Sequence, residues 1–260
     1  MYTKKEIYKS LKELKLKKND SIYVSSSFGM LGRPDFEIKN INDLCRNFFQ
    51  ILQEIIGDKG TIFCPTFTYS FSTKKNIKEN YFDVKKTVSK VGPFGEFIRK
   101  FKSSVRSPDP MISVTGLGND SAILKNINKT SYGKKCIFDQ LKSIDKLKIL
   151  NVGVGPNYIP FLHHIDYLTS CKHRYDKYFK GYIVENNEVR FVKWHYPVAY
   201  KKKWAGADGH KLANLALNNI ISNTKLGIGN IYVSNYSELF DFCLKKSKKN
   251  PWITAVGKKV

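Results

Sequence analysis

The stretch Leu147-Lys148-Ile149-Leu150-Asn151-Val152-Gly153-Val154 carries the clearest strand signal in this chain. Its short apolar run is typical of a strand that is buried inside a sheet. The run ends at Gly155-Pro156, and a short glycine-bearing loop leads on to Pro160, which suits the first turn of a helix. The order of strand, loop and helix predicts an α/β unit at this point.

Strand and helix signals alternate on both sides of this unit. Thr3-Lys4-Lys5-Glu6 has the spacing of a helix capping box, and Gly57 ends an amphipathic stretch that starts near residue 40. Further helices are predicted over residues 93–101, 208–222 and 237–249, and further strands over residues 21–25, 61–65, 112–116, 182–185 and 189–194. This alternation predicts an α/β fold in which helices flank a layered central sheet, mostly parallel or mixed.

The composition is that of a folded chain without a membrane span. Its 260 residues are 42% hydrophobic and 13% aromatic, which excludes disorder of the whole chain. No apolar run reaches the roughly 18 residues that a span needs, and no signal core follows Met1. The five cysteines are widely spaced without a C-x-x-C pair, which favours neither a disulfide framework nor a zinc knuckle. We expect a protein of the reducing cytoplasm.

The charge balance is strongly basic. Lys and Arg number 45 against 22 Asp and Glu, which gives a net charge of +23. Such a charge attracts nucleic acid, anionic lipid or small molecules that carry phosphates. The lysines are dispersed in short runs, however, and no segment concentrates them as a DNA-reading element does, so we predict no nucleic-acid partner. Solvated lysine-rich faces are the alternative interpretation.

Two of the five histidines stand together in the helix predicted after Pro160. His163 and His164 lie within about one turn of its N-terminus, where the helix dipole disfavours imidazolium and keeps a ring neutral. Asp166 shares the helix face of His163, because it follows three residues later. A carboxylate so placed can fix the imidazole tautomer and stabilise the imidazolium as it forms. The pattern predicts His163 as a general base with Asp166 as its partner.

Two other interpretations of these histidines stay open. In the first, one histidine packs in the core while the other faces water. In the second, His163, His164, Asp166 and His173 hold a metal ion. The spacing of this set matches no known ligand pattern, and we therefore predict no metal.

Three further segments carry weaker signals. The Ser/Gly-rich turn after the strand at 21–25 lies where α/β folds expose backbone N–H groups to a ligand. Arg106-Ser107-Pro108-Asp109-Pro110 is a stiff, extended loop that suits either a ligand clamp or a surface turn. Glu96 is either a charge at a helix N-terminus or a buried acid.

Five sequence blocks between about residues 20 and 170 follow one another in a recognisable order. They are Val24-Ser25-Ser26-Ser27-Phe28-Gly29-Met30-Leu31-Gly32, the strand and loop at residues 60–68, Phe82-Asp83 with residues 87–92, residues 106–110 with Ser113, and Leu162-His163-His164-Ile165-Asp166. Together they resemble the aminoglycoside 3-N-acetyltransferase (antibiotic N-acetyltransferase) family, which is acyl-CoA-dependent and unrelated to the GNAT fold. Residues after about 170 match this family weakly.

The resemblance implies an antibiotic N-acetyltransferase-like fold with acetyl-CoA as cosubstrate. It implies that His163 is the catalytic histidine, with Asp166 in place of the family's glutamate. The CoA channel would be lined by Ser25, Ser26, Ser27, Phe28, Gly29, Leu31, Arg106, Ser107 and Ser113. The acceptor would be contacted by Thr66, Tyr69, Asp83 and Glu96. The chain departs from the family at three positions, where Ser25 and Asp109 replace histidines and Pro160 replaces a threonine.

The chemistry of such an enzyme agrees with the residues. Acyl transfer from a thioester to an amine needs a neutral base near pH 7 to take the amine's proton. We expect His163 to do so, while backbone N–H groups of the Ser/Gly turn stabilise the oxyanion. We expect a single acyltransferase domain over residues 1–260, in which about residues 181–260 are a candidate subdomain on the acceptor side.

The net charge of the chain also affects which acceptor we expect. Aminoglycosides are polycations, which a protein of this charge repels unless its cleft is locally acidic, whereas a nucleotide-linked amino sugar is anionic. We therefore expect an N-acyltransferase that acts on a nucleotide-linked amino sugar in surface-glycan synthesis. The alternative is an aminoglycoside 3-N-acetyltransferase that confers antibiotic resistance, and a non-catalytic protein that binds anions or nucleic acid is an alternative of another class. Exposed aromatic residues such as Tyr196, Tyr200 and Trp204 would suit an interface of a homo-oligomer.

Overall fold

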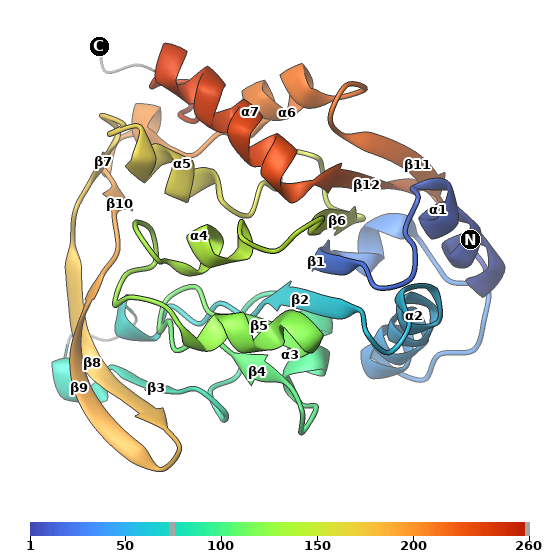
Figure 1. Cartoon of the computed structure of the whole chain (residues 1–260), viewed down its shortest axis with the longest axis horizontal. Helices are drawn as coiled ribbons and strands as arrows, with labels where there is room; N and C mark the ends of the chain where they lie inside the picture. Colours follow the sequence, from blue (N-terminus) through green and yellow to red (C-terminus); the bar gives the residue numbers. More distant parts are fainter. Residues whose placement is uncertain (73–75, 258–260) are drawn as a thin grey trace.

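A computed structural model describes residues 1–72 and 76–257 of the chain (Figure 1). The α-helices are α1 (Lys4–Glu13), α2 (Ile41–Ile56), α3 (Pro93–Arg99), α4 (Ile137–Leu141), α5 (Leu162–Leu168), α6 (His210–Ala216) and α7 (Tyr236–Lys249). The strands are β1 (Ser21–Ser26), β2 (Thr61–Pro65), β3 (Tyr81–Asp83), β4 (Val105–Arg106), β5 (Val114–Gly118), β6 (Lys148–Val152), β7 (Arg174–Tyr175), β8 (Tyr178–Glu185), β9 (Glu188–His195), β10 (Val198–Ala199), β11 (Ser222–Leu226) and β12 (Gly229–Asn235).

A seven-stranded sheet in the order β11-β12-β6-β1-β2-β5-β4 forms the centre of the molecule. Its three middle strands, β6, β1 and β2, run parallel, and β12 and β5 pair with them antiparallel. The sheet is therefore mixed, and helices cover both of its faces. The predicted α/β architecture is confirmed.

The strand residues alternate between two cores. Ile22 and Val24 of β1 face the core that α1, α2 and α3 cover, while Tyr23 faces the core on the other side, with residues of α4, α5, α6 and α7. This alternation follows from the two-residue period of a strand. Figure 1 shows α6 and α7 along one side of the sheet and α2 and α3 on the opposite side. The side of Tyr23 is also the side of α5, which carries the paired histidines.

Several predicted helix ends agree with the structure. Thr3 forms a complete capping box with Glu6, and α2 begins after the cap Asn40 and ends at Gly57, whose φ of 68° suits glycine. The predicted strand at 112–116 lies two residues further on, as β5.

The predicted helix over residues 208–222 is too long. Helix α6 ends at Ala216, and Ser222 already belongs to strand β11. Leu217 is extended and Asn218 has a φ of 65°, a conformation that asparagine tolerates in turns. The chain turns there and returns as β11 and β12, which join the central sheet.

The predicted strands near residues 182–185 and 189–194 are present as the longer β8–β9 hairpin. This hairpin pairs with β3 in a separate three-stranded sheet and projects from the side of the molecule (Figure 1). Within the described ranges, no helix combines the length and apolar character needed to cross a bilayer.

Candidate active site

The carboxyl ends of the parallel strands border a cavity of about 290 Å³. Ser25 comes from the end of β1, Pro65 from the end of β2, and residues 157–160 from the loop that follows β6. This edge of an open α/β sheet is where ligands commonly bind. His163 lies on the lining of this cavity and is a quarter exposed. The described residues that line it are Tyr23, Ser25, Pro65, Phe67, Tyr69, Tyr132, Asn157, Tyr158, Ile159, Pro160, Leu162, His163, Tyr196, Ala207 and Gly209.

The cavity lining is rich in aromatic rings. Among the described residues that form it there is no Asp, Glu, Lys or Arg, and His163 is its one imidazole. A larger hollow of about 590 Å³ lies beside residues 33–38, but its lining contains no histidine. The chemistry of the lining, and not its volume, therefore identifies the candidate site.

The loop between β6 and α5 is held by its own strand. The side-chain amide of Asn151 donates to the carbonyl oxygens of Gly155 and Tyr158 at 3.0 and 3.1 Å. Gly153 has a φ of 67°, and a Cβ at this position would lie 2.3 Å from the carbonyl oxygen of Ser27. Glycine therefore permits β6 and the β1 turn to approach closely. These contacts fix where α5 begins and so aim His163 at the cavity.

His163 and Asp166 form the predicted pair. Nδ1 of His163 lies 3.0 Å from Oδ2 of Asp166. An ionised carboxylate can only accept hydrogen bonds, so Nδ1 carries the proton and donates it to Asp166. The lone pair of the neutral ring is then on Nε2, which is the nitrogen that accepts the proton in general-base catalysis.

Asp166 is almost fully buried and has four partners. Besides His163, its Oδ2 accepts from Nε of Arg174 at 3.0 Å and lies 3.5 Å from Nε2 of His173, while its Oδ1 accepts from the hydroxyl of Thr254 at 2.5 Å. Burial alone would raise the pKa of this carboxyl, but its contacts with His163, His173 and Arg174 outweigh burial and hold the pKa well below its usual range. Asp166 therefore stays ionised and keeps its orienting function.

The environment also keeps His163 neutral. Burial lowers the pKa of His163, and the positive charge of Arg174 acts in the same direction, while Asp166 offsets only part of this. A neutral imidazole at neutral pH is the form that can accept a proton.

His164 points the other way, into the core. It is fully buried, its Nδ1 accepts from the backbone N–H of Gly133 at 3.2 Å, and its ring lies 5.7 Å from that of Phe240. Burial lowers the pKa of His164 to about 4. The structure thus combines two of the interpretations: one histidine packs in the core while its neighbour faces the cavity.

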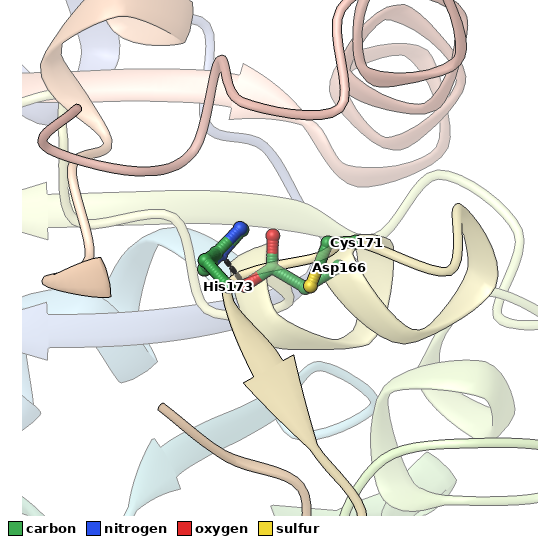
Figure 2. A group of neighbouring side chains, drawn as sticks. All are labelled: Asp166, Cys171 and His173. Atoms are coloured by element: carbon green, nitrogen blue, oxygen red, sulfur yellow. Dashed lines mark ion pairs between the residues drawn. The ribbon is translucent and has the colours of Figure 1, made fainter. Parts of the chain in front are cut away.

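Asp166, Cys171 and His173 form a compact group that could in principle ligate an ion (Figure 2). Their possible ligand atoms lie within 4.8 Å of one another. The Asp166 oxygen in this group already accepts from His163 and from the guanidinium of Arg174. A divalent cation would have to displace these donors beside a fixed positive charge, so the donor set fits a hydrogen-bond network better than a metal site.

The predicted CoA-channel residues of the β1 turn are divided between cavity and core. Ser25 lies on the cavity lining, whereas Phe28 and Leu31 are buried against the α2 and α3 side. The N–H of Ser27 donates to Val152. Ser26, Ser27 and Gly29 are not on the cavity lining, and a CoA contact of this turn stays a prediction.

Arg106, Ser107 and Ser113 form a buried structural cluster outside the cavity lining. Arg106 donates to the Ser113 hydroxyl at 3.0 Å and to the carbonyl oxygens of Thr66 and Thr87 at 2.7 and 2.6 Å. Ser107 accepts from the N–H of Val114 at 2.9 Å. These bonds tie the segment to β5, and a role in binding CoA stays a prediction.

The structure brings only one of the predicted acceptor contacts to the cavity. Tyr69 lines it, but Thr66 is fully buried and bonds to Ser113. Asp83 accepts from the N–H groups of Lys85 and Lys86 in a turn, and Glu96 pairs with Arg99. Burial tends to raise the pKa of Glu96, but its bonds with Arg99 and Ser89 lower it overall.

Sequence reasoning missed the residues after position 170 that complete the site. Arg174 and Thr254 bind Asp166, and Tyr196, expected on an interface, instead lines the cavity. One signal was available: only six of the 45 basic residues are arginine. In a chain whose basic residues are mostly lysine, the arginine eight residues after Asp166 indicates a position that requires a planar guanidinium group with several N–H donors.

Comparisons with known proteins identify the family and the fold of the chain. A family model described as aminoglycoside 3-N-acetyltransferase matches residues 35–247. No curated protein matches the chain significantly.

Solved structures share the fold. A binary complex of AAC-IIIb with CoASH has a TM-score of 0.78 at 15% identity and covers 99% of each chain. AAC-VIa bound to sisomicin has a TM-score of 0.76 at 16% identity, over 95% of this chain and 98% of that one. The YokD protein from Bacillus subtilis has a TM-score of 0.74 at 17% identity, over 96% and 94%. At these identities the likeness establishes the fold.

Proposed function

The chain belongs to the aminoglycoside 3-N-acetyltransferase family, and from this premise we propose that it transfers the acetyl group of acetyl-CoA to an amine of an aminoglycoside-type amino sugar, with His163 as the general base. The observation that carries the proposal is the hydrogen-bonded His163–Asp166 pair, with His163 on the lining of the cavity. A family of N-acyltransferases needs such a base, whereas a protein that only binds anions does not. The non-catalytic alternative has no comparable support.

The pair supplies the proton chemistry of the reaction. Nε2 of His163 takes a proton from the amine as its nitrogen attacks the thioester carbonyl, and Asp166 stabilises the imidazolium that forms. The new C–N bond forms as the C–S bond breaks. The leaving CoA thiolate then takes the proton from His163, which returns the base to its neutral form.

The expected nucleotide-linked acceptor is not supported, and the family match favours the aminoglycoside alternative. Lysine and arginine are common partners of a pyrophosphate group, and the described part of the cavity lining includes neither. Exposed charges are screened over about 8 Å at physiological ionic strength, so dispersed surface lysines say little about the inside of a cavity. The net charge was a poor guide to the acceptor for this reason.

We propose that aromatic ring faces hold the amino groups of the acceptor in place of carboxylates. Six rings line the cavity, those of Tyr23, Phe67, Tyr69, Tyr132, Tyr158 and Tyr196. An ammonium group over such a face gains a cation–π attraction of about 1 kcal/mol, more when it is desolvated. The same faces can pack against the apolar side of a sugar ring.

Detection of free thiol released from acetyl-CoA tests the proposed function directly. The panel of acceptors is sisomicin, kanamycin and UDP-linked amino sugars. We expect saturable release with an aminoglycoside and none above background with the nucleotide-linked sugars. His163→Ala should remove the signal, while His210→Ala, a change at an exposed histidine, should retain it. Release with the UDP-linked sugars alone would overturn the acceptor assignment.

The role of the rings has its own test. Tyr158→Ala should raise the acceptor KM about fivefold, the equivalent of one cation–π contact. Tyr8→Ala, at a partly exposed tyrosine on α1, is the matched control and should leave KM unchanged. An unchanged KM in Tyr158→Ala would exclude this ring from acceptor binding.

A further inference from the structure

The guanidinium of Arg174 spans the His163–Asp166 pair. Its Nε donates to Oδ2 of Asp166 at 3.0 Å, its Nη2 lies 3.0 Å from Nε2 of His163, and its Nη1 donates to the carbonyl oxygen of Pro197 at 3.1 Å. The side chain is only 8% exposed. Each of its three nitrogens thus has a partner in a fixed direction, which a planar fork can satisfy and a lysine cannot.

These contacts define the state of the base before the acceptor binds. Arginine can only donate, so Nε2 of His163 must accept the hydrogen bond from Nη2. Nδ1 therefore keeps its proton for Asp166, and the tautomer is the one that catalysis needs. The lone pair that should receive the proton of the amine is, however, already engaged by Arg174.

We propose that Arg174 is a positioning residue. In the resting enzyme its Nη2–H donates a hydrogen bond to the lone pair on Nε2 of His163, and during the reaction the acceptor amine replaces Arg174 in this contact. This inference rests on the proposed function of His163. The exchange needs little movement, since the Nε bond to Asp166 and the Nη1 bond to Pro197 can remain while one N–H leaves Nε2. The amine then makes the contact with Nε2 that Arg174 had made.

Arg174 also acts on the protonated base. Imidazolium carries N–H groups on both nitrogens, so its Nε2–H would face an N–H of Arg174, with two positive charges in contact. The groups that face His163 are Asp166 from α5, Arg174 from β7, His173 from the segment before β7, and the ring of Tyr132 at 5.6 Å. Asp166 is the one negative charge among them. The return of Arg174 to Nε2 thus favours transfer of the proton from His163 to the CoA thiolate and resets the base.

The test compares Arg174→Met, which removes the charge, with Arg174→Lys, which keeps it. The readout is the pH dependence of kcat/KM, whose acid limb reports the ionisation of the base in the free enzyme. Lys177→Met is the control, because Lys177 is an exposed residue three positions away that contacts the ring of Phe179. A thermal melt of each variant establishes that it is folded.

We expect the acid limb of Arg174→Met to move up by about one pH unit or more, because a charge in contact shifts a pKa by this amount. Arg174→Lys should return it most of the way toward the wild-type position, and Lys177→Met should not move it. Above the limb, kcat of Arg174→Met should stay within about tenfold of wild type, since the base and its carboxylate remain. The proposal would be overturned if both Arg174 variants lost activity equally at every pH and the acid limb did not move. Such a result would show that Arg174 has a merely structural role.

A second readout does not need turnover. The pKa of His163 in the free protein can be followed by NMR titration, with the resonance assigned by its loss in His163→Gln. A higher pKa in Arg174→Met than in wild type is the expected result, and equal values would overturn the proposal. Absence of thiol release in the wild type would instead refute the proposed function, so the two failures are distinguishable.

Discussion

The two faces of helix α5 show how one helix can place adjacent histidines in opposite roles. His163 faces the cavity, is a quarter exposed, and is bonded to a carboxylate and a guanidinium. His164, the next residue, is fully buried, bonds to the backbone of Gly133, and packs near Phe240. Both rings are kept neutral, but by different surroundings and with different consequences.

The difference teaches that a lowered pKa alone does not identify a catalytic base. Burial lowers the pKa of both histidines. Of the two, His163 alone combines a lowered pKa with a carboxylate partner and a place on the cavity lining. On this account, changes at His163 affect catalysis and changes at His164 affect stability, and the following experiments separate the two.

The largest effect is expected from His163→Ala. Loss of the base should lower kcat by about 10³-fold, within the range of general-base catalysis. The variant should remain folded and still bind CoA, although Asp166 and Arg174 each lose one hydrogen-bond partner. Thiol release and calorimetric titration with CoA measure the two properties. An unchanged kcat would remove the base assignment.

Asp166→Asn should have a smaller effect on the same face. The imidazole remains, but a neutral amide no longer stabilises the imidazolium that forms during the reaction, so kcat should fall by about 10²-fold. Steady-state kinetics at saturating acetyl-CoA check this. A fall in stability with full activity per folded molecule would instead assign Asp166 a purely structural role.

On the opposite face of α5, His164→Leu should lower the stability of the protein and leave its kcat nearly unchanged. Leucine fills a similar space but leaves the N–H of Gly133 without its acceptor, which should cost about 1–3 kcal/mol of unfolding free energy. The kcat of the folded variant should remain close to that of wild type. Urea denaturation measures the loss of stability, and initial rates measure kcat. A large loss of kcat without a loss of stability would contradict both expectations.

The smallest effect concerns acid stability. The pKa of His164 is about 4 in the folded protein and about 6.5 in an unfolded chain. Between these pH values His164 is protonated in the unfolded state and neutral in the folded state. The free energy of unfolding should therefore fall as the pH drops from 6.5 toward 4. His164→Leu lacks this contribution, and its stability deficit relative to wild type should be smaller at pH 5 than at pH 7. An equal deficit at both pH values, measured by urea denaturation, would contradict this.

The central part of the molecule could be predicted from the sequence because its signals are local. The apolar run of β6, the glycines after it and the three-residue spacing from His163 to Asp166 predict the strand, the loop and the paired side chains. The helix after residue 208 was predicted too long, because the turn at Leu217 and Asn218 interrupts an otherwise helical pattern.

The rest of the site depends on contacts between distant segments. Thr254 meets Asp166 across 88 positions, and Tyr196 meets Tyr132 with ring centroids 5.3 Å apart. No periodicity or local motif encodes such pairs. The nucleotide-linked acceptor expected from the net charge is not supported by the family match. Net charge sums over a whole surface, whereas recognition depends on the few side chains of a cavity lining.

The pH dependence of kcat/KM for the wild-type enzyme tests the central claim most directly, namely that His163 is an unprotonated base in the resting enzyme. Because burial and Arg174 lower the pKa of His163, the acid limb should lie below pH 6.5, the ordinary value for histidine. Activity should therefore be retained at pH 6.5 and be lost only at lower pH. A limb above pH 6.5, or a profile without an acid limb, would contradict the account.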